Sequence, residues 1–554
     1  MARSLNEIIR SVTEIYLQNI TPSSHPSPEV IETELVEKVS TEIKLENALR
    51  DKGDKLHIPQ KLCASQIADI MMKTCCIRRI CCGGVSADPE YDLLSIYMTE
   101  GEDEGIYVTS EDVFKRIAKQ YNYSITSREM KDVLELVALS APRVMRTNDR
   151  DLIAVNNGIF NYVTKTLEPF SEDYVFMAKS RVNYNVNATN VQITEPDGDI
   201  WDIESWMDDL SDDPEVVDIL WKVLGAIIRP FVRWNKSAWF YSNTGNNGKG
   251  TLCELMRQLC GEGSYASVPL VDFAKDFALE PLTRSTAIIV DENDVGLYID
   301  KAANLKAVIT NDVIAINRKF KTPISYQFYG FMVQCLNEFP RIKDKSDSFY
   351  RRQLFIPFDR CFTGREKKYI KEDYLHRQEV LEYVLYKVLN MPDYYELTAP
   401  ESCVVALTEY KDFNDPVRQY MEEIMEQLQW DLVPFSFLYE LYKAWFKKNM
   451  PSGGIQGRNT FITDFLNILP EYPEWYCLGR SKAIRTGSRM VKPEPLIYEY
   501  NLTEFRNARY TGNDPERIST LSDVKATYNG ILRQSSGLDV GDGDGSDDLS
   551  ESES

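Results

Sequence analysis

Apolar positions recur with two different periods along the chain, and stretches of the two kinds alternate. Stretches with helical spacing lie at 32–50, 110–118, 127–138, 216–228, 251–259, 415–428, 434–446 and 460–469. Short apolar runs that are typical of strands lie at 93–97, 105–108, 151–155, 238–241, 286–290 and 330–337. The pattern predicts an α/β core, with a mixed α+β region before it and a helical region after it.

The same pattern divides the chain into five segments. They are an N-terminal region of unknown role (1–91), a mixed α+β domain (92–215), an α/β domain (216–395), a C-terminal domain (396–510) and an acidic tail (511–554). The end of the tail consists of Gly, Ser, Asp and Glu with few apolar residues. We therefore expect the tail to be disordered.

Charge and composition restrict the classes of function. The net charge is −22 over 554 residues, which argues against a protein that only coats nucleic acid and confines any contact with DNA to local basic patches. The N-terminus lacks the apolar core of a signal peptide, and no apolar run approaches the roughly 18 residues of a membrane span. We expect a cytoplasmic protein, within a host cell if a virus or mobile element encodes it, with its 11 cysteines reduced.

Four cysteines are clustered in a short stretch, at Cys75, Cys76, Cys81 and Cys82. Pairs of adjacent cysteines do not have the spacing of a zinc motif, and the chain contains only three histidines. We interpret the cluster as buried or partly exposed thiols, with a metal site as the alternative.

A glycine-rich loop follows the apolar run at 238–241. Its residues are Gly245, Asn246, Asn247, Gly248, Lys249, Gly250 and Thr251. Strand, glycine-rich turn, Lys-x-Thr and helix form the layout that binds a polyphosphate, because glycines let N–H groups point inward and the helix N-terminus attracts anions. Lys249 would contact the terminal phosphates and Thr251 would offer a hydroxyl to Mg²⁺. Two departures from the usual loop are Asn243, where a glycine is expected, and Gly250, which displaces the hydroxyl by one place.

Two acids follow the apolar run at 286–290. Asp291 and Glu292 stand at the carboxyl end of a predicted buried strand, where ligands of open α/β sheets bind. We assign Asp291 to Mg²⁺ and Glu292 to the attacking water of phosphoryl transfer. The alternative is a strand that ends in a solvated turn.

A basic hairpin is predicted between residues 312 and 328. Alternating residues flank a tip that carries Arg318, Lys319 and Lys321 together with Phe320. Cations for phosphates and a flat ring for bases suit single-stranded nucleic acid. An ordinary solvated turn explains the same residues equally well.

A second basic stretch lies between residues 480 and 492. It has five basic residues and no acid, and four of them are candidates for contact with DNA: Arg480, Lys482, Arg485 and Arg489. Three predicted helices followed by a basic, glycine-containing hairpin are similar to a winged-helix module.

Three polar residues complete the set of candidates. Asn337 ends the apolar run at 330–337, where its amide could sense a γ-phosphate or orient water. Arg351 and Arg352 follow further along the chain. An arginine at a subunit edge can enter the neighbouring active site of a closed ring and neutralise transition-state charge. The alternative is a structural arginine pair.

Taken in order, these motifs resemble those of a superfamily 3 helicase, and more narrowly those of the phage, plasmid and poxvirus primase–helicase group. The stretch Ile153–Phe160 and the C-terminal segment also resemble that group, so the resemblance covers roughly residues 92 to 510. It implies an AAA+-like P-loop ATPase core and a hexameric ring around DNA. It also implies ATP-driven translocation, usually 3′ to 5′ on one strand.

The resemblance implies a role for each matching residue. These roles are Walker A for Lys249 and Thr251, Walker B for Asp291 and Glu292, DNA contact for Lys319 or Lys321, sensor 1 for Asn337, and the arginine finger for Arg351 or, as the second choice, Arg352.

We therefore expect an ATP- and Mg²⁺-dependent DNA helicase for the replication of a phage or mobile element. Its partners would be DNA, further copies of the chain, and replication proteins bound through residues 1–91 or the acidic tail. We expect no primer synthesis, because residues 1–91 show no Asp-x-Asp at a strand end. The alternatives are an origin-binding initiator or loader that hydrolyses ATP without unwinding, and a P-loop nucleotide kinase.

Overall fold

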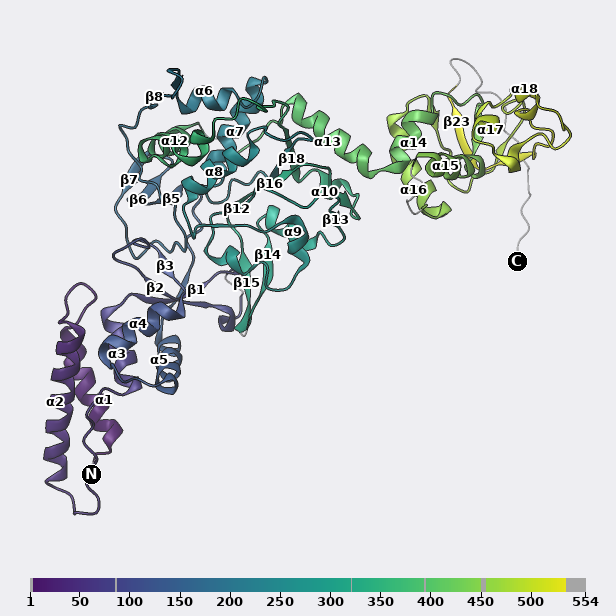
Figure 1. Cartoon of the computed structure of the whole chain (residues 1–554). Coiled ribbons are helices and arrows are strands. Elements are labelled where there is room, and N and C mark those ends of the chain that lie inside the picture. Colours follow the sequence, from purple (N-terminus) through teal and green to yellow (C-terminus); the bar gives the residue numbers. More distant parts are fainter. Residues whose placement is uncertain (1–2, 85–86, 320, 393–394, 450–454, 535–554) are drawn as a thin grey trace, which may run out of the picture. The chain divides into compact units, whose positions relative to one another are not determined.

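The computed structural model describes residues 3–84, 87–319, 321–392, 395–449 and 455–534. The chain forms two compact units, Met1–Thr408 and Glu409–Ser554, and each contains helices and strands (Figure 1). The mixed α/β fold expected from the sequence is confirmed. Within the described ranges, no helix is both long enough and apolar enough to cross a membrane.

The N-terminal part of the first unit contains five helices, which pack mainly on one another, and a small sheet. The helices are α1 (Leu5–Tyr16), α2 (Pro28–Asn47), α3 (Ala64–Thr74), α4 (Glu111–Tyr121) and α5 (Ser127–Ser140). In sheet order the strands are β3 (Tyr107–Val108), β2 (Leu93–Tyr97), β1 (Ile77–Cys81) and β4 (Arg143–Met145). Capping boxes at Ser4 and Thr126 fix the first turns of α1 and α5.

A five-stranded parallel sheet forms the centre of the first unit. In spatial order its strands are β11 (Tyr265–Ala266), β12 (Ala287–Val290), β16 (Phe331–Leu336), β10 (Ser237–Tyr241) and β18 (Gln353–Pro357). Tyr241 of β10 pairs with Leu336 of β16, and Val290 of β12 pairs with Gln334. The carboxyl ends of these three strands therefore lie along one edge of the sheet, which is the edge where ligands of such sheets bind.

Three helices cover one face of this sheet: α7 (Pro214–Ala226), α8 (Lys249–Cys260) and α12 (Gln378–Asn390) (Figure 1). Alternate strand residues enter this core because side chains of a strand alternate between its faces. They include Ala238, Phe240, Ile289, Val333, Cys335 and Ile356.

A second small sheet and a short helix share the same core. These are β5 (Leu152–Val155), β6 (Gly158–Asn161), β7 (Thr166–Glu168) and α6 (Ile203–Asp208). The strand predicted at 151–155 is therefore confirmed. Further short elements of the unit are β8 (Ile193–Thr194), β9 (Ile200–Trp201), β13 (Tyr298–Ile299), β17 (Arg341–Ile342), α10 (Asp347–Tyr350) and α11 (Lys368–Glu372).

The predicted basic hairpin is present. Strands β14 (Val313–Arg318) and β15 (Lys321–Gln327) pair antiparallel after helix α9 (Ala303–Ile309). The base of the hairpin is fixed to the N-terminal sheet, because the Gln327 amide donates to the Cys82 carbonyl at 3.0 Å. Phe320 at the tip lies outside the described residues.

The second unit contains the three predicted helices. They are α14 (Pro416–Ile424), α15 (Phe435–Asn449) and α16 (Arg458–Ile468). In sheet order its strands are β19 (Leu432–Pro434), β23 (Gly530–Arg533) and β20 (Trp475–Tyr476), with β21 (Ile484–Arg485) paired to β22 (Thr527–Tyr528). Short helices α17 (Leu496–Glu499) and α18 (Pro515–Ile518) follow, and α13 (Glu401–Asn414) spans the boundary between the units.

Two expectations for this unit need correction. The basic stretch 480–492 does not pair with itself as a hairpin, because its strand β21 pairs with β22, about forty residues later. Strand β23 is the central strand of the three-stranded sheet, so ordered structure continues well into the segment 511–554 assigned to the tail. Residues 535–554 lie outside the described part.

Candidate functional site

The glycine-rich loop joins β10 to α8, as the sequence predicts. Gly248 is the residue before the helix and has a φ of +87°, and Asn246 has a φ of +53°. A Cβ on Gly248 would also lie 2.6 Å from the Leu210 Cδ2 atom. Backbone conformation and space both favour glycine here, so the loop can turn directly into the helix N-terminus.

Lys249 is the first residue of α8 and is almost completely buried, with 5% of its surface exposed. Its Nζ atom donates a long bond of 3.4 Å to the Ser242 carbonyl at the start of the loop. Burial lowers the pKa of the Lys249 ammonium, and the nearby Asp291 carboxylate opposes this shift. The cation is therefore held beneath the loop, without an anion in direct contact.

Asp291 stands at the end of β12, directly beside α8. A Cβ on Gly250 would lie 3.1 Å from Asp291 Oδ1 and 3.3 Å from Oδ2. Any side chain at position 250 would crowd this carboxylate, which explains why glycine follows the lysine and why the hydroxyl comes one place later, at Thr251. The fold thus brings Lys249, Gly250 and Asp291 together from two separate motifs.

Glu292 and Asn293 have different surroundings although they are neighbours. Glu292 is exposed at the edge of the sheet. Asn293 is buried, and its Nδ2 donates to Gln334 Oε1 and to the Cys335 carbonyl, both at 3.0 Å. Sequence reasoning missed Asn293, whose bonds fix the end of β12 to β16 and thereby position Asp291.

Asn337 lies one residue past β16, at the same edge as the loop. The Ser242 amide donates to the Leu336 carbonyl at 3.2 Å, so the start of the glycine-rich loop and the end of β16 are joined. The Asn337 side chain is exposed. The sheet therefore places Asn337 with Lys249 and Asp291, as the order of motifs predicts.

The two arginines lie at the opposite end of the sheet. The Ser237 amide, at the amino end of β10, donates to the Arg352 carbonyl at 2.9 Å. Strand β10 has five residues, so the arginines are about 16 Å from the glycine-rich loop of the same chain at roughly 3.3 Å per residue. One chain does not bring Arg351 or Arg352 to its own loop.

The surroundings of the two guanidinium groups distinguish them. Arg352 is half-buried, and its Nη1 donates to the Ser348 carbonyl and, at 2.9 Å, to Ser348 Oγ. Arg351 is exposed, and among the described residues its side chain has no hydrogen bond or ion pair. Arg352 stabilises the turn after α10, whereas Arg351 is available to another molecule.

A cavity of about 770 Å³ opens beside the glycine-rich loop. The loop contributes Asn246, Gly248 and Thr251. The facing wall carries aromatic residues together with equal numbers of bases and acids: Trp201, Trp206, Phe362, Arg360, Arg365, Lys367, Lys368, Lys371, Glu195, Asp199, Asp202, Asp209 and Glu366. The Phe362 amide donates to the Asn246 carbonyl at 2.7 Å, which holds the wall against the loop. Sequence reasoning missed this wall, because its residues are scattered between 195 and 371 without a recurring motif.

The basic hairpin residues are partly engaged within the chain. Lys321 Nζ lies 2.7 Å from Glu111 Oε1 of α4. Arg318 donates from Nε and Nη2 to the Thr322 carbonyl, and burial lowers the pKa of its guanidinium. Lys319 is exposed. A groove of about 1160 Å³ runs between the hairpin and the N-terminal helices and is lined by both cations and acids.

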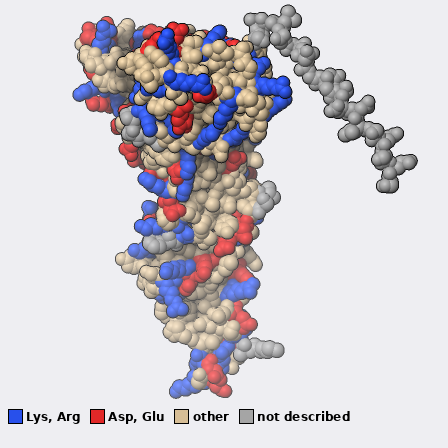
Figure 2. All heavy atoms as spheres, turned by 90° about the vertical axis from the view of Figure 1, so that its right-hand side faces the viewer, with Lys and Arg blue, Asp and Glu red and all other residues tan. Residues whose placement is uncertain are grey.

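The four basic residues of the second unit are exposed. Arg480 is held against α16, because its Nη1 donates to Thr463 Oγ1 at 3.1 Å and its Nη2 to Asn459 Oδ1 at 3.1 Å. Arg489 donates to the Arg485 carbonyl at 3.0 Å. Over the face drawn in Figure 2, Lys and Arg side chains are interspersed with Asp and Glu.

The cluster from Cys75 to Cys82 does not converge on one point. Cys76 Sγ lies 3.4 Å from Tyr107 Oη, and Cys82 Sγ lies 3.7 Å from Met177 Sδ. Cys81 donates to the Gly84 carbonyl at 3.0 Å. Neither of the two groups in the described ranges that could hold a metal ion includes these thiols, so they are dispersed buried or half-buried residues.

Comparisons with known proteins match two parts of the chain. Residues 240–352 match a family of unknown function, DUF5906, and residues 413–489 match a family described as poxvirus D5 protein-like. No curated protein matches the sequence. The second match supports the resemblance to the phage, plasmid and poxvirus group noted in the sequence.

Among solved structures, similar chains come from the C-terminal region of NrS-1. An "A form apo structure" of this region covers 84% of the present chain and 98% of its own, at 12% identity and a TM-score of 0.40. An apo structure of NrS-1 residues 305–718 covers 77% of the present chain and 98% of its own, at 12% identity and a TM-score of 0.41.

Proposed function

We propose that the chain is an ATP- and Mg²⁺-dependent DNA helicase of the superfamily 3 type, which serves the replication of a phage or mobile genetic element. Its first unit would contain an AAA+-like P-loop motor, and its second a winged-helix-like domain. Primer synthesis is not part of the proposal. One observation carries it: Lys249, Gly250 and Asp291 meet at the carboxyl edge of a five-stranded parallel sheet.

The residues at this edge fit a nucleoside triphosphate and its metal ion. Backbone N–H groups of the loop and the N-terminus of α8 offer donors to phosphates, and buried Lys249 lacks an anionic partner in direct contact. Asp291 and Thr251 would hold Mg²⁺, which neutralises phosphate charge when bound. Exposed Glu292 would orient the attacking water, and Asn337 would contact the terminal phosphate.

The cavity beside the loop has the size and lining expected for the rest of the nucleotide. Its volume of about 770 Å³ is in the range of ordinary small-molecule pockets. Trp206 and Phe362 offer apolar surface for a base, and the five bases and five acids around them offer hydrogen-bond partners for the polar groups of the base and sugar. We place the nucleoside here.

The position of Arg351 supports assembly into a ring. Its exposed guanidinium lies at the end of the sheet away from its own loop, so it can complete only the site of a neighbouring chain. Head-to-tail contacts of this kind close into rings. We propose a hexamer in which Arg351 of one chain supports hydrolysis at Lys249 of the next.

The hairpin would couple hydrolysis to movement on DNA. Arg318, Lys319 and Lys321 lie on or beside one turn, where they can follow a phosphate backbone. In the present structure Glu111 neutralises Lys321, and single-stranded DNA would replace this carboxylate with a phosphate. Movement of the hairpin through the ring would then pull one strand, with 3′ to 5′ polarity expected.

Hydrolysis of ATP by the purified chain, and its dependence on DNA, tests the proposal. We expect MgATP hydrolysis that single-stranded DNA stimulates, and loss of both activities in Lys249→Ala. Lys301→Ala, which removes an exposed lysine elsewhere in the same unit, is the matched control. Absence of hydrolysis in the folded wild-type chain, with and without DNA, would overturn the proposal.

A second function is favoured by the exposed basic residues of the second unit. Arg480, Lys482, Arg485 and Arg489 could bind duplex DNA at an origin, and the chain would then be an initiator or loader that does not unwind. Strand displacement on a forked duplex distinguishes the two functions, because an initiator hydrolyses ATP without separating the strands. Phosphate transfer to a nucleoside monophosphate would instead identify a nucleotide kinase.

A further inference from the structure

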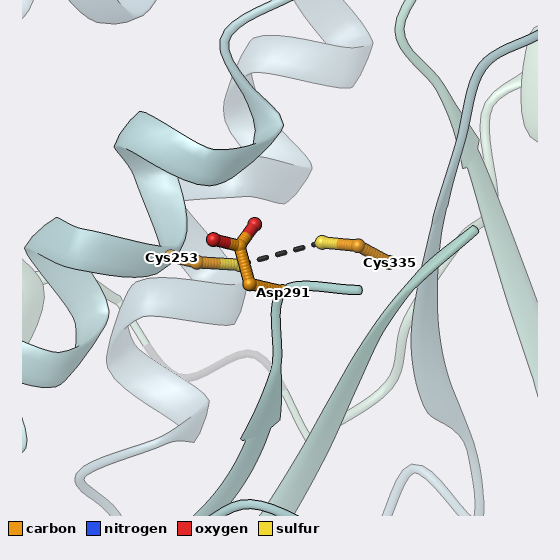
Figure 3. A group of neighbouring side chains, drawn as sticks. All are labelled: Cys253, Asp291 and Cys335. Atoms are coloured by element: carbon orange, nitrogen blue, oxygen red, sulfur yellow. Dashed lines mark hydrogen bonds between the residues drawn. The ribbon is translucent and has the colours of Figure 1, made fainter. Parts of the chain in front are cut away.

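Two cysteines and Asp291 form a compact group beneath the glycine-rich loop. Cys253 lies on α8, one turn after Lys249, and Cys335 is the penultimate residue of β16. The two sulfur atoms are 3.3 Å apart, and the two sulfurs and a carboxylate oxygen of Asp291 all lie within 4.8 Å of one another. Figure 3 shows the three side chains projecting toward a common point from three different elements.

Core packing and hydrogen bonds hold all three side chains in place. Cys253 and Cys335 are 0% and 1% exposed and belong to the core between α8 and the sheet. Asn293 ties the end of β12 to the Cys335 carbonyl, so the segment that carries Asp291 is joined to the strand that carries one of the thiols. Asp291 is about one-third exposed and lies beside Gly250 of the loop, with Arg257 Nη1 3.8 Å from its Oδ2, so the group has one partly open side next to the candidate nucleotide site.

We propose that Cys253, Cys335 and Asp291 form a binding site for a thiophilic divalent cation of the Zn²⁺ class. Two thiolates and one carboxylate would supply three ligands, and the open side would leave a fourth position for water or a phosphate oxygen. Binding releases the two thiol protons to solvent. Mg²⁺ would not compete for the sulfur atoms, because it requires oxygen ligands.

The distance between the sulfurs favours a metal ion over a disulfide. With Zn–S bonds of about 2.3 Å, tetrahedral geometry separates two sulfurs by about 3.8 Å, which differs from the observed 3.3 Å by about half an ångström. A disulfide would require the two sulfur atoms to approach to about 2.05 Å, which is more than an ångström shorter than their distance in this structure. Residues fixed in a packed core accommodate the smaller change more readily.

Occupation of this site would act on the proposed ATPase. Asp291 would bind the thiophilic ion instead of Mg²⁺, and the new charge would lie close to the Lys249 ammonium. We therefore expect Zn²⁺ to inhibit ATP hydrolysis. This consequence rests on the proposed function, whereas the binding site itself does not.

Binding of Co²⁺ to the full-length protein tests the site without any assay of activity. Cobalt occupies the same kind of site as zinc, and its thiolate complexes give a charge-transfer band in the near ultraviolet. We expect one Co²⁺ per chain with this band, and its loss when Zn²⁺ is added. The measurement is made in a phosphine reductant, so that all thiols remain reduced.

Variants assign the band to these residues. Cys253→Ala and Cys335→Ala should each abolish it, and Asp291→Asn should weaken Co²⁺ binding by about tenfold or more. Two controls should keep it: Cys260→Ala, another buried thiol of α8, and Cys361→Ala, an exposed thiol near the loop. A band that survives in correctly folded Cys253→Ala and Cys335→Ala, or is absent from the wild type, would overturn the site.

Inhibition by Zn²⁺ separates this inference from the proposed function. If the cobalt band is present and the wild-type chain hydrolyses no ATP, the metal site is supported and the proposed ATPase function is rejected. If the chain hydrolyses ATP and gives no cobalt band, the ATPase function is supported and the metal site is rejected. When both are present, Cys335→Ala should raise the Zn²⁺ concentration that halves hydrolysis by about tenfold or more, and an unchanged value would contradict the link between the two sites.

Discussion

At the scale of single residues, the contact between Gly250 and Asp291 explains the unusual order of the loop. The residue after the phosphate-binding lysine ordinarily carries the hydroxyl, and here the Asp291 carboxylate takes that space. The sequence shows both motifs but not their contact, because they are forty residues apart. The spacing of motifs in a sequence predicts which strand ends lie at the same edge of a sheet. How closely two side chains approach each other can be determined only from the packed structure.

This contact leads to a prediction for Gly250→Ala. The added methyl group would lie 3.1 Å and 3.3 Å from the Asp291 oxygens, so the carboxylate must move by a few tenths of an ångström. We expect the Mg²⁺ concentration for half-maximal ATP hydrolysis to rise several-fold, since small misplacements of catalytic groups cost about this much. Stability, followed by thermal unfolding, should change little by comparison. An unchanged Mg²⁺ dependence would contradict the assignment of Asp291.

A second prediction concerns Glu494 in the second unit. Burial raises the pKa of this carboxyl to about 7, although the amides of Gln429 and Trp430 donate to it. The folded state therefore holds a proton more tightly than the unfolded state. The protonated Glu494 carboxyl therefore contributes its whole stabilising effect below about pH 4.5, and this effect is lost as the pH rises toward 7.

Hydrogen exchange at the Gln429 and Trp430 amides measures this effect. Between about pH 5 and pH 8, after correction for intrinsic exchange, we expect local stability to fall by about 1 to 3 kcal/mol. In Glu494→Gln the fall should disappear, because the amide side chain does not titrate. A fall of equal size in that variant would assign the pH dependence to other groups.

At the scale of elements, local patterns in the sequence predicted three strands of the central sheet and the hairpin, but fewer than half of the elements of the first unit. The strand runs 238–241, 286–290 and 330–337, and the hairpin between 312 and 328, appear where their periodicity placed them. The basic stretch 480–492 was misinterpreted because its strand partner is Thr527–Tyr528. Short strands have little periodicity, and pairing between distant segments leaves no local signal, so neither β22 nor β23 could be predicted from their own residues.

The hairpin gives a prediction at this scale. We expect Lys321→Ala to keep basal ATP hydrolysis and to lose most of its stimulation by single-stranded DNA, because the change removes a phosphate contact on β15 and leaves Lys249 and Asp291 in place. The experiment measures hydrolysis as a function of DNA concentration. Unchanged stimulation would remove Lys321 from the contact with DNA.

Glu111→Gln is the matched control for this variant. It breaks the same ion pair of 2.7 Å from the other side and leaves the lysine in place. Both groups are substantially exposed, so the pair contributes at most about 1 kcal/mol to stability. We expect DNA stimulation to be kept or increased. Loss of stimulation in both variants would show that the pair matters for structure instead.

At the scale of the whole molecule, the proposal depends on an assembly in which Arg351 serves a neighbouring chain. Mixing Arg351→Ala subunits with wild-type subunits tests this directly. We expect DNA-stimulated hydrolysis to fall faster than the fraction of wild-type chain, because each variant subunit impairs its neighbour.

Arg352→Ala provides the comparison in the same experiment. The Arg352 side chain is hydrogen-bonded to Ser348 of its own chain. Removing its guanidinium should therefore affect only the subunit that carries the substitution. Mixtures with this variant should follow simple dilution. Simple dilution with Arg351→Ala as well would argue against a site shared between chains.

Strand displacement is the most direct test of the central claim, which is that hydrolysis at Lys249 and Asp291 drives unwinding of DNA. The measurement follows release of a labelled strand from a forked duplex with purified protein, MgATP and single-stranded tails of either polarity. We predict release that requires ATP, prefers a 3′ tail and disappears in Lys249→Ala. A folded wild-type chain that hydrolyses ATP and binds the fork but releases no strand would contradict the account.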